Sequence, residues 1–287
     1  MKDYFEIKSA KHFSLNKTPT ILKPKYHSDN QYKSILDHHR ARLEESQTLL
    51  YSNHARAMLI IFQGMDTAGK DGAIKHVMSG VNPQGCSVIS FKTPTTNELD
   101  HDYLWRVNRV LPDRGIIGIF NRSYYEEVLV TRVHPQILKK ENLPTGGKHN
   151  HQFWELRYQD ILNYESYLDR QGYDIVKIFI HISKDEQKRR LLERFADPHK
   201  FWKISEGDVQ ERGFWKDYQD AYEKCIRHTS SSLNPWYIVP GDDKDNARLS
   251  IAKILVDRFS KMKLQYPILT HEEKKKLKKL RSTLEKD

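Results

Sequence analysis

Three residues with a defined spacing point to phosphate chemistry. Gly64, Gly69 and Lys70 match the G-x-x-x-x-G-K pattern of a phosphate-binding loop. Glycines let such a loop turn tightly, so that its backbone N–H groups approach an anion. The helix expected to start near Gly69 adds the positive end of its dipole, and Lys70 adds a mobile cation. We therefore expect phosphate oxygens to be held by Gly64, Thr67, Ala68, Gly69, Lys70, Asp71 and Gly72.

The same loop carries two carboxylates. Asp66 lies inside it, and Asp71 stands where the common pattern has Ser or Thr. Beside a polyanion these acids would repel their ligand, unless a bridging Mg²⁺ turned the repulsion into attraction. The alternative is a glycine turn with two solvated acids. We favour a metal site with Asp66 as the metal-binding residue, Mg²⁺ as the cofactor and Mn²⁺ as its substitute, because an apolar segment precedes the loop and a helical pattern follows it.

Polar residues also follow the apolar segment 115–120, which is expected to be a strand. In P-loop proteins such a strand usually ends in an acid that faces Mg²⁺. Here the residue is Asn121, which keeps an oxygen but lacks the charge. Arg122 comes next, and Glu126 and Arg132 lie in the helix expected after it. This edge therefore gains cations where an anion is usual.

A second group of cations lies in a helical segment, residues 184–196, after the fourth expected strand. Its arginines are Arg189, Arg190 and Arg194, and Lys203 follows among aromatic residues. In small P-loop kinases this region is a lid that closes over phosphates, so we expect these four side chains to bind phosphate. A solvated helix face is the alternative for Arg189 and Arg190.

The elements that must position these side chains alternate between strands and helices. Short apolar runs predict strands, and apolar residues at helical spacing predict the helices between them. The expected strands are 58–63, 87–91, 115–120, 174–183 and 235–239, and the expected helices include 32–52, 69–80, 98–110, 151–171, 184–196, 206–227 and 245–261. This alternation predicts an α/β fold of three layers around a five-stranded, mainly parallel sheet. Ligands bind such sheets at the carboxyl edge, where the polar loop with Lys92, Pro94 and Thr95 is expected.

The amino-acid composition limits the classes of ligand and the cellular compartment that we expect for this protein. The formal charge of +10 over 287 residues favours an anionic ligand. No apolar run approaches the length of a membrane span, so no membrane association is expected. The two cysteines, far apart in sequence, suit reduced thiols in the cytoplasm.

Three regions are expected along the chain. Residues 1–55 form an N-terminal extension with a helix on the core, and residues 56–265 form the P-loop domain, with its lid at about 184–210. Residues 266–287 form a basic tail with leucines at helical spacing. We expect the tail helix to dock on the protein or on a sister subunit, which predicts a homo-oligomer. A solvated charged tail is the alternative.

Several motifs in the same order resemble the polyphosphate kinase 2 family. They are the 64–72 loop, Asn82–Gly85, His101–Arg106, Gly118–Glu126, the arginine-rich segment that ends at Asp197–Pro198, and Trp202–Ser205, which together cover roughly residues 58–240. The family often has Asp at the position of Asn121. Members with Asn resemble the branch that phosphorylates both AMP and ADP.

The resemblance implies a thymidylate-kinase-like P-loop fold with a helical lid, and Mg²⁺-dependent phosphoryl transfer between inorganic polyphosphate and adenine nucleotides, with guanine nucleotides as further candidates. On this view Asp66, Lys70, Arg122 and Arg132 are catalytic. The expected nucleotide-binding residues are Lys92, Pro94, Thr95, Asn121 and Glu126.

Two rival functions remain open from the sequence. One is an ATP-dependent nucleotide kinase of the same fold, against which the excess of lid cations argues, because a triphosphate needs fewer of them. The other is a nucleic-acid-binding P-loop ATPase, suggested by the basic tail and by lysines interleaved with aromatic residues. That rival predicts salt-sensitive binding to oligonucleotides, whereas we expect no specific nucleic-acid partner.

Overall fold

One six-stranded sheet forms the centre of the molecule. The computed structural model describes residues 4–8, 12–141, 143–144 and 149–286. The strands lie in the order β1-β6-β5-β2-β4-β3, and every neighbouring pair is parallel except β1 with β6. Their bounds are β1 Phe5–Ile7, β2 Ala57–Gly64, β3 Cys86–Ser90, β4 Ile117–Asn121, β5 Tyr173–His181 and β6 Trp236–Pro240. The expected α/β architecture is thereby confirmed.

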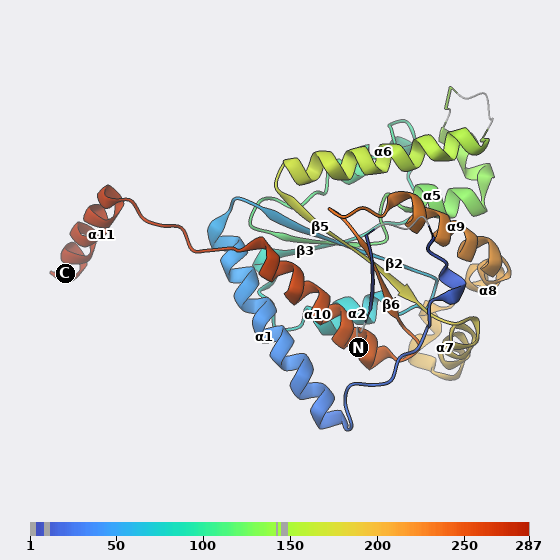
Figure 1. Ribbon diagram of the computed structural model, residues 1–287, viewed down its shortest axis with the longest axis horizontal. Helices are drawn as coiled ribbons and strands as arrows, with labels where there is room; N and C mark the ends of the chain where they lie inside the picture. The colour runs from blue at the N-terminus through green and yellow to red at the C-terminus, as the bar shows by residue number, and fades with distance from the viewer. Residues whose placement is uncertain (1–3, 9–11, 142, 145–148, 287) are drawn as a thin grey trace.

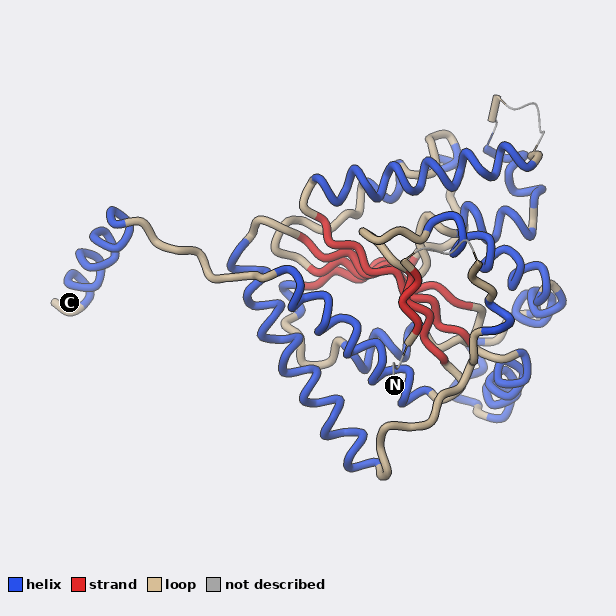
Figure 2. Tube along the Cα trace, viewed as in Figure 1, coloured by secondary structure: helices blue, strands red, loops and turns tan. Residues whose placement is uncertain are grey.

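Helices cover both faces of this sheet (Figures 1 and 2). One layer contains α1, α2 and α10, and the opposite layer contains α5, α6 and α9. The helices that cover the sheet are α1 Asp29–Asn53, α2 Lys70–Val77, α5 Glu126–Val133, α6 His151–Arg170, α9 Trp215–Thr229 and α10 Lys244–Met262. The others are α3 Thr96–Leu99, α4 Trp105–Asn108, α7 Lys184–Ala196, α8 Glu206–Gly213 and α11 His271–Leu284, with 3₁₀ turns η1 Leu15–Lys17, η2 Pro83–Gly85, η3 Pro135–Glu141 and η4 Pro198–Lys203.

The central strands read as continuous apolar runs because helices cover them on both sides. All eight residues of β2 are buried, and so are the last eight of the nine residues of β5. β2 lies between β4 and β5, so the loop that follows it emerges at the middle of the carboxyl edge. This placement gives the 64–72 loop a rigid support.

The sequence did not predict the sixth strand. β1 has three half-buried residues, and it exists because Phe5 pairs with Ile238 and Ile7 with Trp236 on β6. A strand this short carries no periodic pattern of its own, because its stability comes from a partner more than two hundred residues away.

Two predicted helices are interrupted in the structure. The segment 98–110 contains the last two residues of α3 and all of α4, separated by a turn in which the Asp102 carboxylate accepts a hydrogen bond from the Leu104 N–H at 2.9 Å. The segment 206–227 divides at Phe214, directly after Gly213. Local side-chain hydrogen bonds and a glycine oppose the continuous helix that hydrophobic spacing alone predicts.

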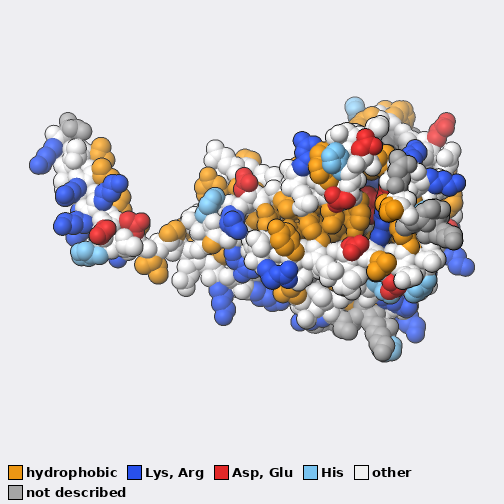
Figure 3. Space-filling model, turned by 90° about the horizontal axis from the view of Figure 1, so that it is seen from above, with side chains coloured by type: hydrophobic (Ala, Val, Ile, Leu, Met, Phe, Trp, Pro, Cys, Tyr) orange, Lys and Arg blue, Asp and Glu red, His pale blue; other side chains and the backbone are white. Residues whose placement is uncertain are grey.

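The C-terminal helix α11 lies apart from the body, beyond an extended stretch that follows α10 (Figure 1). Its hydrogen bonds and ion pairs, within the part of the chain that the structure describes, stay inside the helix and its cap. Figure 3 shows apolar side chains along one side of this helix and lysines and arginines along the other. Among the described residues α11 therefore does not dock on its own subunit. No helix among the described residues is long and apolar enough to cross a membrane.

Candidate active site

The loop between β2 and α2 has the backbone that an anion-binding turn requires. Gly64 has a φ of +158°, and an added Cβ there would lie 2.9 Å from the Ile180 carbonyl oxygen of the neighbouring strand. Gly69 precedes α2 with a φ of +102°, a conformation that side chains disfavour. Thr67, between them, also has a positive φ of 63°. The glycine spacing seen in the sequence thus corresponds to close packing at one end of the loop and a left-handed turn at the other.

The Lys70 side chain lies along this loop. Its ammonium group donates to the Gly64 carbonyl at 2.8 Å and to the Met65 carbonyl at 3.3 Å. Burial lowers the pKa of Lys70, and the nearby Arg122 guanidinium lowers it further. An ammonium group has three donors, so one N–H remains for an anion on the open side of the loop.

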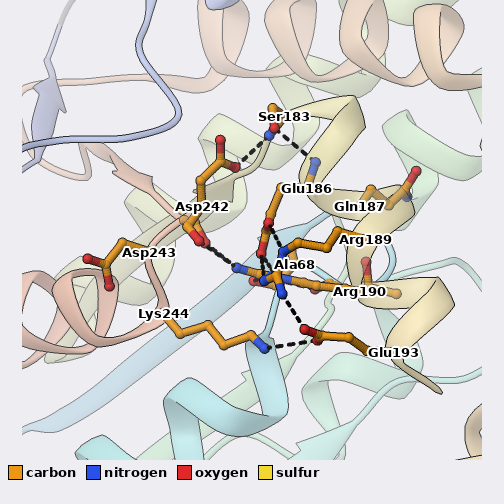
Figure 4. Close-up of polar contacts among 12 residues, drawn as sticks. Ala68, Ser183, Glu186, Gln187, Arg189, Arg190, Glu193, Asp242, Asp243 and Lys244 are labelled. Atoms are coloured by element: carbon orange, nitrogen blue, oxygen red, sulfur yellow. Dashed lines mark hydrogen bonds and ion pairs between the residues drawn. The ribbon is translucent and has the colours of Figure 1, made fainter. Parts of the chain in front are cut away.

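Arg190 holds the loop from the lid side (Figure 4). It is 4% exposed, and its guanidinium donates to the carbonyls of Thr67 at 3.0 Å and Ala68 at 2.8 Å. The same group donates to the Gly241 carbonyl, and Glu186 accepts from its Nε at 2.5 Å. The structure therefore places Arg190 in a different role from the one expected, because backbone carbonyls and Glu186 use its donors to fix the loop against the start of α10.

Two residues at the end of β4 pair with the two carboxylates of the loop. The Arg122 guanidinium donates to the Asp66 carboxylate at 2.9 Å, and the Asn121 amide donates to the Asp71 carboxylate at 2.5 Å. Arg122 has a φ of 65° and also lies 3.6 Å from the Glu126 carboxylate. The β4 edge faces the phosphate loop directly, as the order of the strands predicts.

Beside the loop, burial and neighbouring charges have opposite effects on the pKa of Glu126. Burial raises the pKa of Glu126, while Arg122 and Lys70 oppose that rise. Glu126 in turn raises the pKa of Arg122. A cation and an acid are thus held together next to the loop, and an arriving phosphate would compete with Glu126 for Arg122.

A wide cavity of about 790 Å³, here named the phosphate cavity, lies above the loop. Eight of its lining residues are cations: Lys70, Lys92, Arg122, Arg190, Arg194, Lys200, Lys203 and Lys244. The remaining lining residues are the rest of 66–72 and 90–93, with Asn121, Glu193 and Trp202. This excess of cations suits a ligand with many negative charges.

A smaller cavity of about 170 Å³, here named the side cavity, lies between the loop after β3, α5 and η3. Its wall combines apolar residues with carboxylates and cations, and it includes Phe91, Pro94, Leu99, Glu98, Arg106, Glu126, Glu127, Val130, Ile137 and Glu141. Phe91, Lys92, Thr93 and Arg122 line both cavities. The two cavities therefore meet at Arg122 and at the loop after β3.

Several of the predicted site residues lie elsewhere. The Arg132 guanidinium stacks 5.0 Å from the Trp154 ring and lies 3.4 Å from the Tyr158 hydroxyl, and Arg132 lines neither cavity. Arg189 is half exposed and lines neither cavity, and it pairs on its own helix with Glu186 and with Glu193, a carboxylate that lines the phosphate cavity. Helical spacing places residues on a helix but does not say which face meets the ligand.

Residues of the lid segment and of the loop after β3 line different parts of the two cavities. Arg194 and Lys203 line the phosphate cavity, although the Arg194 guanidinium also donates to the Lys203 carbonyl at 2.9 Å. Lys92 lines both cavities and Pro94 lines the side cavity, whereas Thr95 lines neither and caps α3. The lid therefore adds cations above the loop, and the segment 92–94 separates the two cavities.

Sequence reasoning missed Lys244, Arg106 and Glu127. Lys244 begins α10 at the carboxyl end of β6, so its place after a strand was an available signal. Arg106, the last residue of the His101–Arg106 motif, and Glu127 come from α4 and α5 and meet only in the folded chain, so no contiguous motif contains both.

The residues present fit a divalent cation that is shared with phosphate. Among the described parts of the chain no group of three or more His, Cys, Asp or Glu side chains is arranged to hold a metal ion. Mg²⁺ usually takes only one or two carboxylates and completes its shell with water and substrate phosphate oxygens. Asp66 and Asp71, both lining the phosphate cavity, are such a pair.

Comparison with known proteins gives consistent results. The family model described as "Polyphosphate kinase 2 (PPK2)" matches residues 26–267. An ADP-polyphosphate phosphotransferase from Rhodopseudomonas palustris is 49% identical over 98% of this chain and 97% of its own. An AMP/ADP-polyphosphate phosphotransferase from Meiothermus ruber is 44% identical over 79% of this chain and 80% of its own. The crystal structure of polyphosphate kinase 2 from Arthrobacter aurescens superimposes with a TM-score of 0.82 at 36% identity, covering 95% of both chains.

Proposed function

Because this chain belongs to the polyphosphate kinase 2 family, we propose that it transfers a phosphoryl group reversibly between inorganic polyphosphate and adenine nucleotides, converting AMP to ADP and ADP to ATP. The contact between the two cavities at Arg122 is the observation that supports this proposal most strongly. One cavity suits a long polyanion, the other suits a small ligand with an apolar part, and both reach the same arginine.

Polyphosphate occupies the phosphate cavity on this proposal. The amides of residues 66–72 and the Lys70 ammonium bind its terminal phosphates, as at other glycine-rich loops that precede a helix. Arg194, Lys203 and Lys244 bind phosphates farther along the polymer. Arg190 keeps the loop in shape through its bonds to the Thr67 and Ala68 carbonyls.

The acceptor nucleotide places its base in the side cavity and its phosphate beside Arg122 and Lys92. An oxygen of that phosphate attacks the terminal phosphorus of polyphosphate. A new P–O bond forms, the bridging P–O bond of polyphosphate breaks, and the shortened polymer leaves with the electron pair. The attacking oxygen is already anionic, so no side chain needs to remove a proton. Positioning and charge neutralisation supply the catalysis.

Each protein group has a defined role in this step. Lys70 and Arg122 neutralise charge on the transferring phosphoryl group, and Arg122 exchanges its Asp66 and Glu126 partners for phosphate. Asp66, with Asp71 near it, would hold Mg²⁺ or its substitute Mn²⁺, whose chemistry is to neutralise and orient phosphate oxygens. Bonds of the same type break and form, so the reaction runs in both directions.

The direct test is an assay that contains polyphosphate, AMP and Mg²⁺ but no ATP. We expect ADP and then ATP to appear, and we expect polyphosphate and ADP to be regenerated from ATP in the reverse direction. GMP and GDP in parallel assays measure base preference. Activity with ATP alone as donor, and none with polyphosphate, would identify a conventional nucleotide kinase instead.

Assembly into a homo-oligomer is part of this proposal. In α11, Leu277, Leu280 and Leu284 lie on one side of the helix and are each at least half exposed. A second copy of the chain would cover them. Light scattering on the full chain and on a variant that ends after residue 265 measures this: loss of oligomeric mass on truncation supports the assignment, and an unchanged mass removes α11 from the interface.

A further inference from the structure

The wall of the side cavity contains a buried carboxylate that receives no hydrogen bond from the described residues. Glu127 is 6% exposed and lies one helical position beyond Glu126 at the start of α5. Its nearest cations are the Arg106 guanidinium at 3.8 Å and the Arg157 guanidinium at 3.6 Å. Both distances exceed those of a hydrogen bond. Within the described residues no N–H or O–H donates to this carboxylate, although it lines the cavity.

Both neighbouring arginines direct their donors to other acceptors. Arg106 donates to the Lys92 carbonyl at 2.9 Å. Arg157 donates to the Glu127 main-chain carbonyl at 3.1 Å and to the Glu141 carboxylate. The arginines therefore neutralise the charge of Glu127 while leaving its oxygen lone pairs open. A buried carboxylate in this condition has unused capacity to accept hydrogen bonds.

A second polar atom supports a ligand at this wall. Among the described residues the buried Tyr103 hydroxyl has no hydrogen-bond partner, and Tyr103 lines the same cavity. Burial raises the pKa of Glu127 to about 7, with Glu141 adding to that rise, which is the behaviour of an acid that lacks hydrogen-bond donors in the folded protein. Phe91, Leu99 and Val130 form apolar parts of the wall. A flat aromatic ligand with an N–H donor at its edge fits this combination.

We propose that Glu127 determines base specificity, by accepting a hydrogen bond from the exocyclic 6-amino group of adenine while the ring packs among Phe91, Leu99 and Val130. This inference rests on the proposed function, because it assigns the acceptor base to the side cavity. Adenine presents an amino donor at position 6, whereas hypoxanthine and guanine present an oxygen there. The ionised carboxylate accepts from the first and repels the second, so above the pKa of Glu127, about 7, the site selects adenine over 6-oxopurines.

The test compares AMP with IMP as acceptors, with polyphosphate as donor. A hydrogen bond to a charged group corresponds to about a 10- to 100-fold preference. We expect the wild-type protein to favour AMP over IMP in kcat/KM by at least that factor. Equal use of AMP and IMP by the wild-type protein would overturn the inference without any variant.

Glu127→Gln supplies the matched variant, because an amide has nearly the same shape and can donate to the 6-oxo group as well as accept. We expect the AMP-to-IMP ratio to fall by at least about 10-fold, with an unchanged KM for polyphosphate. Glu98→Gln is the control. Glu98 lines the same cavity, but its carboxylate accepts from the Thr95 N–H at 2.7 Å, so the ratio should stay at its wild-type value.

The two proposals fail in different ways. If the wild-type protein transfers no phosphoryl group from polyphosphate to any nucleotide, the proposed function is wrong. If it phosphorylates AMP but Glu127→Gln, shown to be folded by its melting curve, keeps the wild-type ratio, only the role of Glu127 is wrong. A structural role for Glu127 would lower the rates with AMP and IMP together and leave their ratio unchanged.

Discussion

The phosphate cavity and the side cavity differ in size and in the chemistry of their lining residues. The first is wide, and its eight cations come from the loop, the β3 and β4 edges, the lid and α10. The second is smaller and mixes apolar residues with paired carboxylates and arginines. Charge alone attracts a polymer of identical units, whereas a nucleotide base has to be read by shape and hydrogen bonds. Substitutions in the two cavities should therefore have separable effects on donor and acceptor.

Lys70→Ala should have the largest effect, because it removes a cation from the transferring phosphoryl group. A lost charge-assisted contact costs about 1.5–3 kcal/mol before any additional effect in the transition state, so we expect kcat/KM to fall by at least about 100-fold. AMP and ADP should be affected alike. A folded Lys70→Ala protein with wild-type turnover would exclude the loop from the mechanism.

Asp66→Asn should have the second-largest effect on activity. The amide keeps the size of the side chain but loses the charge that favours a divalent cation and pairs with Arg122 at 2.9 Å. We expect activity to fall by about 10- to 100-fold, and the Mg²⁺ concentration required for half-maximal rate to rise. Titrating Mg²⁺ with both proteins measures this, and identical titration curves would make Asp66 a solvated turn residue.

Asn121→Asp should change the balance between acceptors. Asn121 donates to Asp71, so an Asp at this position would place two carboxylates within hydrogen-bond distance. On the proposed mechanism that added negative charge lies beside the transferring phosphate, where AMP and ADP differ in charge. The AMP-to-ADP ratio of rates should shift in Asn121→Asp, while Lys70→Ala lowers both rates. An unchanged ratio would leave Asn121 as a partner of Asp71 without influence on acceptor choice.

The smallest effect is expected in the lid. Lys203→Ala should raise the KM for polyphosphate by about 2- to 5-fold, as expected for a single exposed charge pair, and leave the KM for AMP unchanged. Arg189→Ala is the matched control, because Arg189 is on the same lid segment but lines neither cavity, and Glu186 and Glu193 already neutralise its charge. Equal effects of the two substitutions would mean that the lid attracts polyphosphate only through its total charge.

The contrast between the cavities also explains which parts of the site the sequence could predict. The loop residues 64–72 are contiguous, so their spacing was sufficient to predict a glycine turn that leads into a helix, while their binding of phosphate stays a prediction. Asn121 and Arg122 were placed correctly at the end of a strand because parallel strands share one carboxyl edge.

Most residues of the side cavity could not be predicted from motif spacing or strand order. Arg106, Glu127 and Arg157 come from three helices and meet only through packing. Arg190 and Arg132 show the same limit of sequence reasoning. Their residue type gave the charge and helical spacing gave the helix, but neither could show that Arg190 donates to the loop carbonyls or that Arg132 stacks on Trp154.

The kinetic order of the two substrates tests most directly whether donor and acceptor meet at Arg122. Initial rates are measured while polyphosphate and AMP are both varied, and reciprocal plots are drawn for each fixed concentration. Direct transfer between two occupied cavities predicts lines that intersect, because both substrates must be bound at once. Parallel lines would indicate a phosphorylated protein intermediate, and they would contradict transfer across the junction of the two cavities.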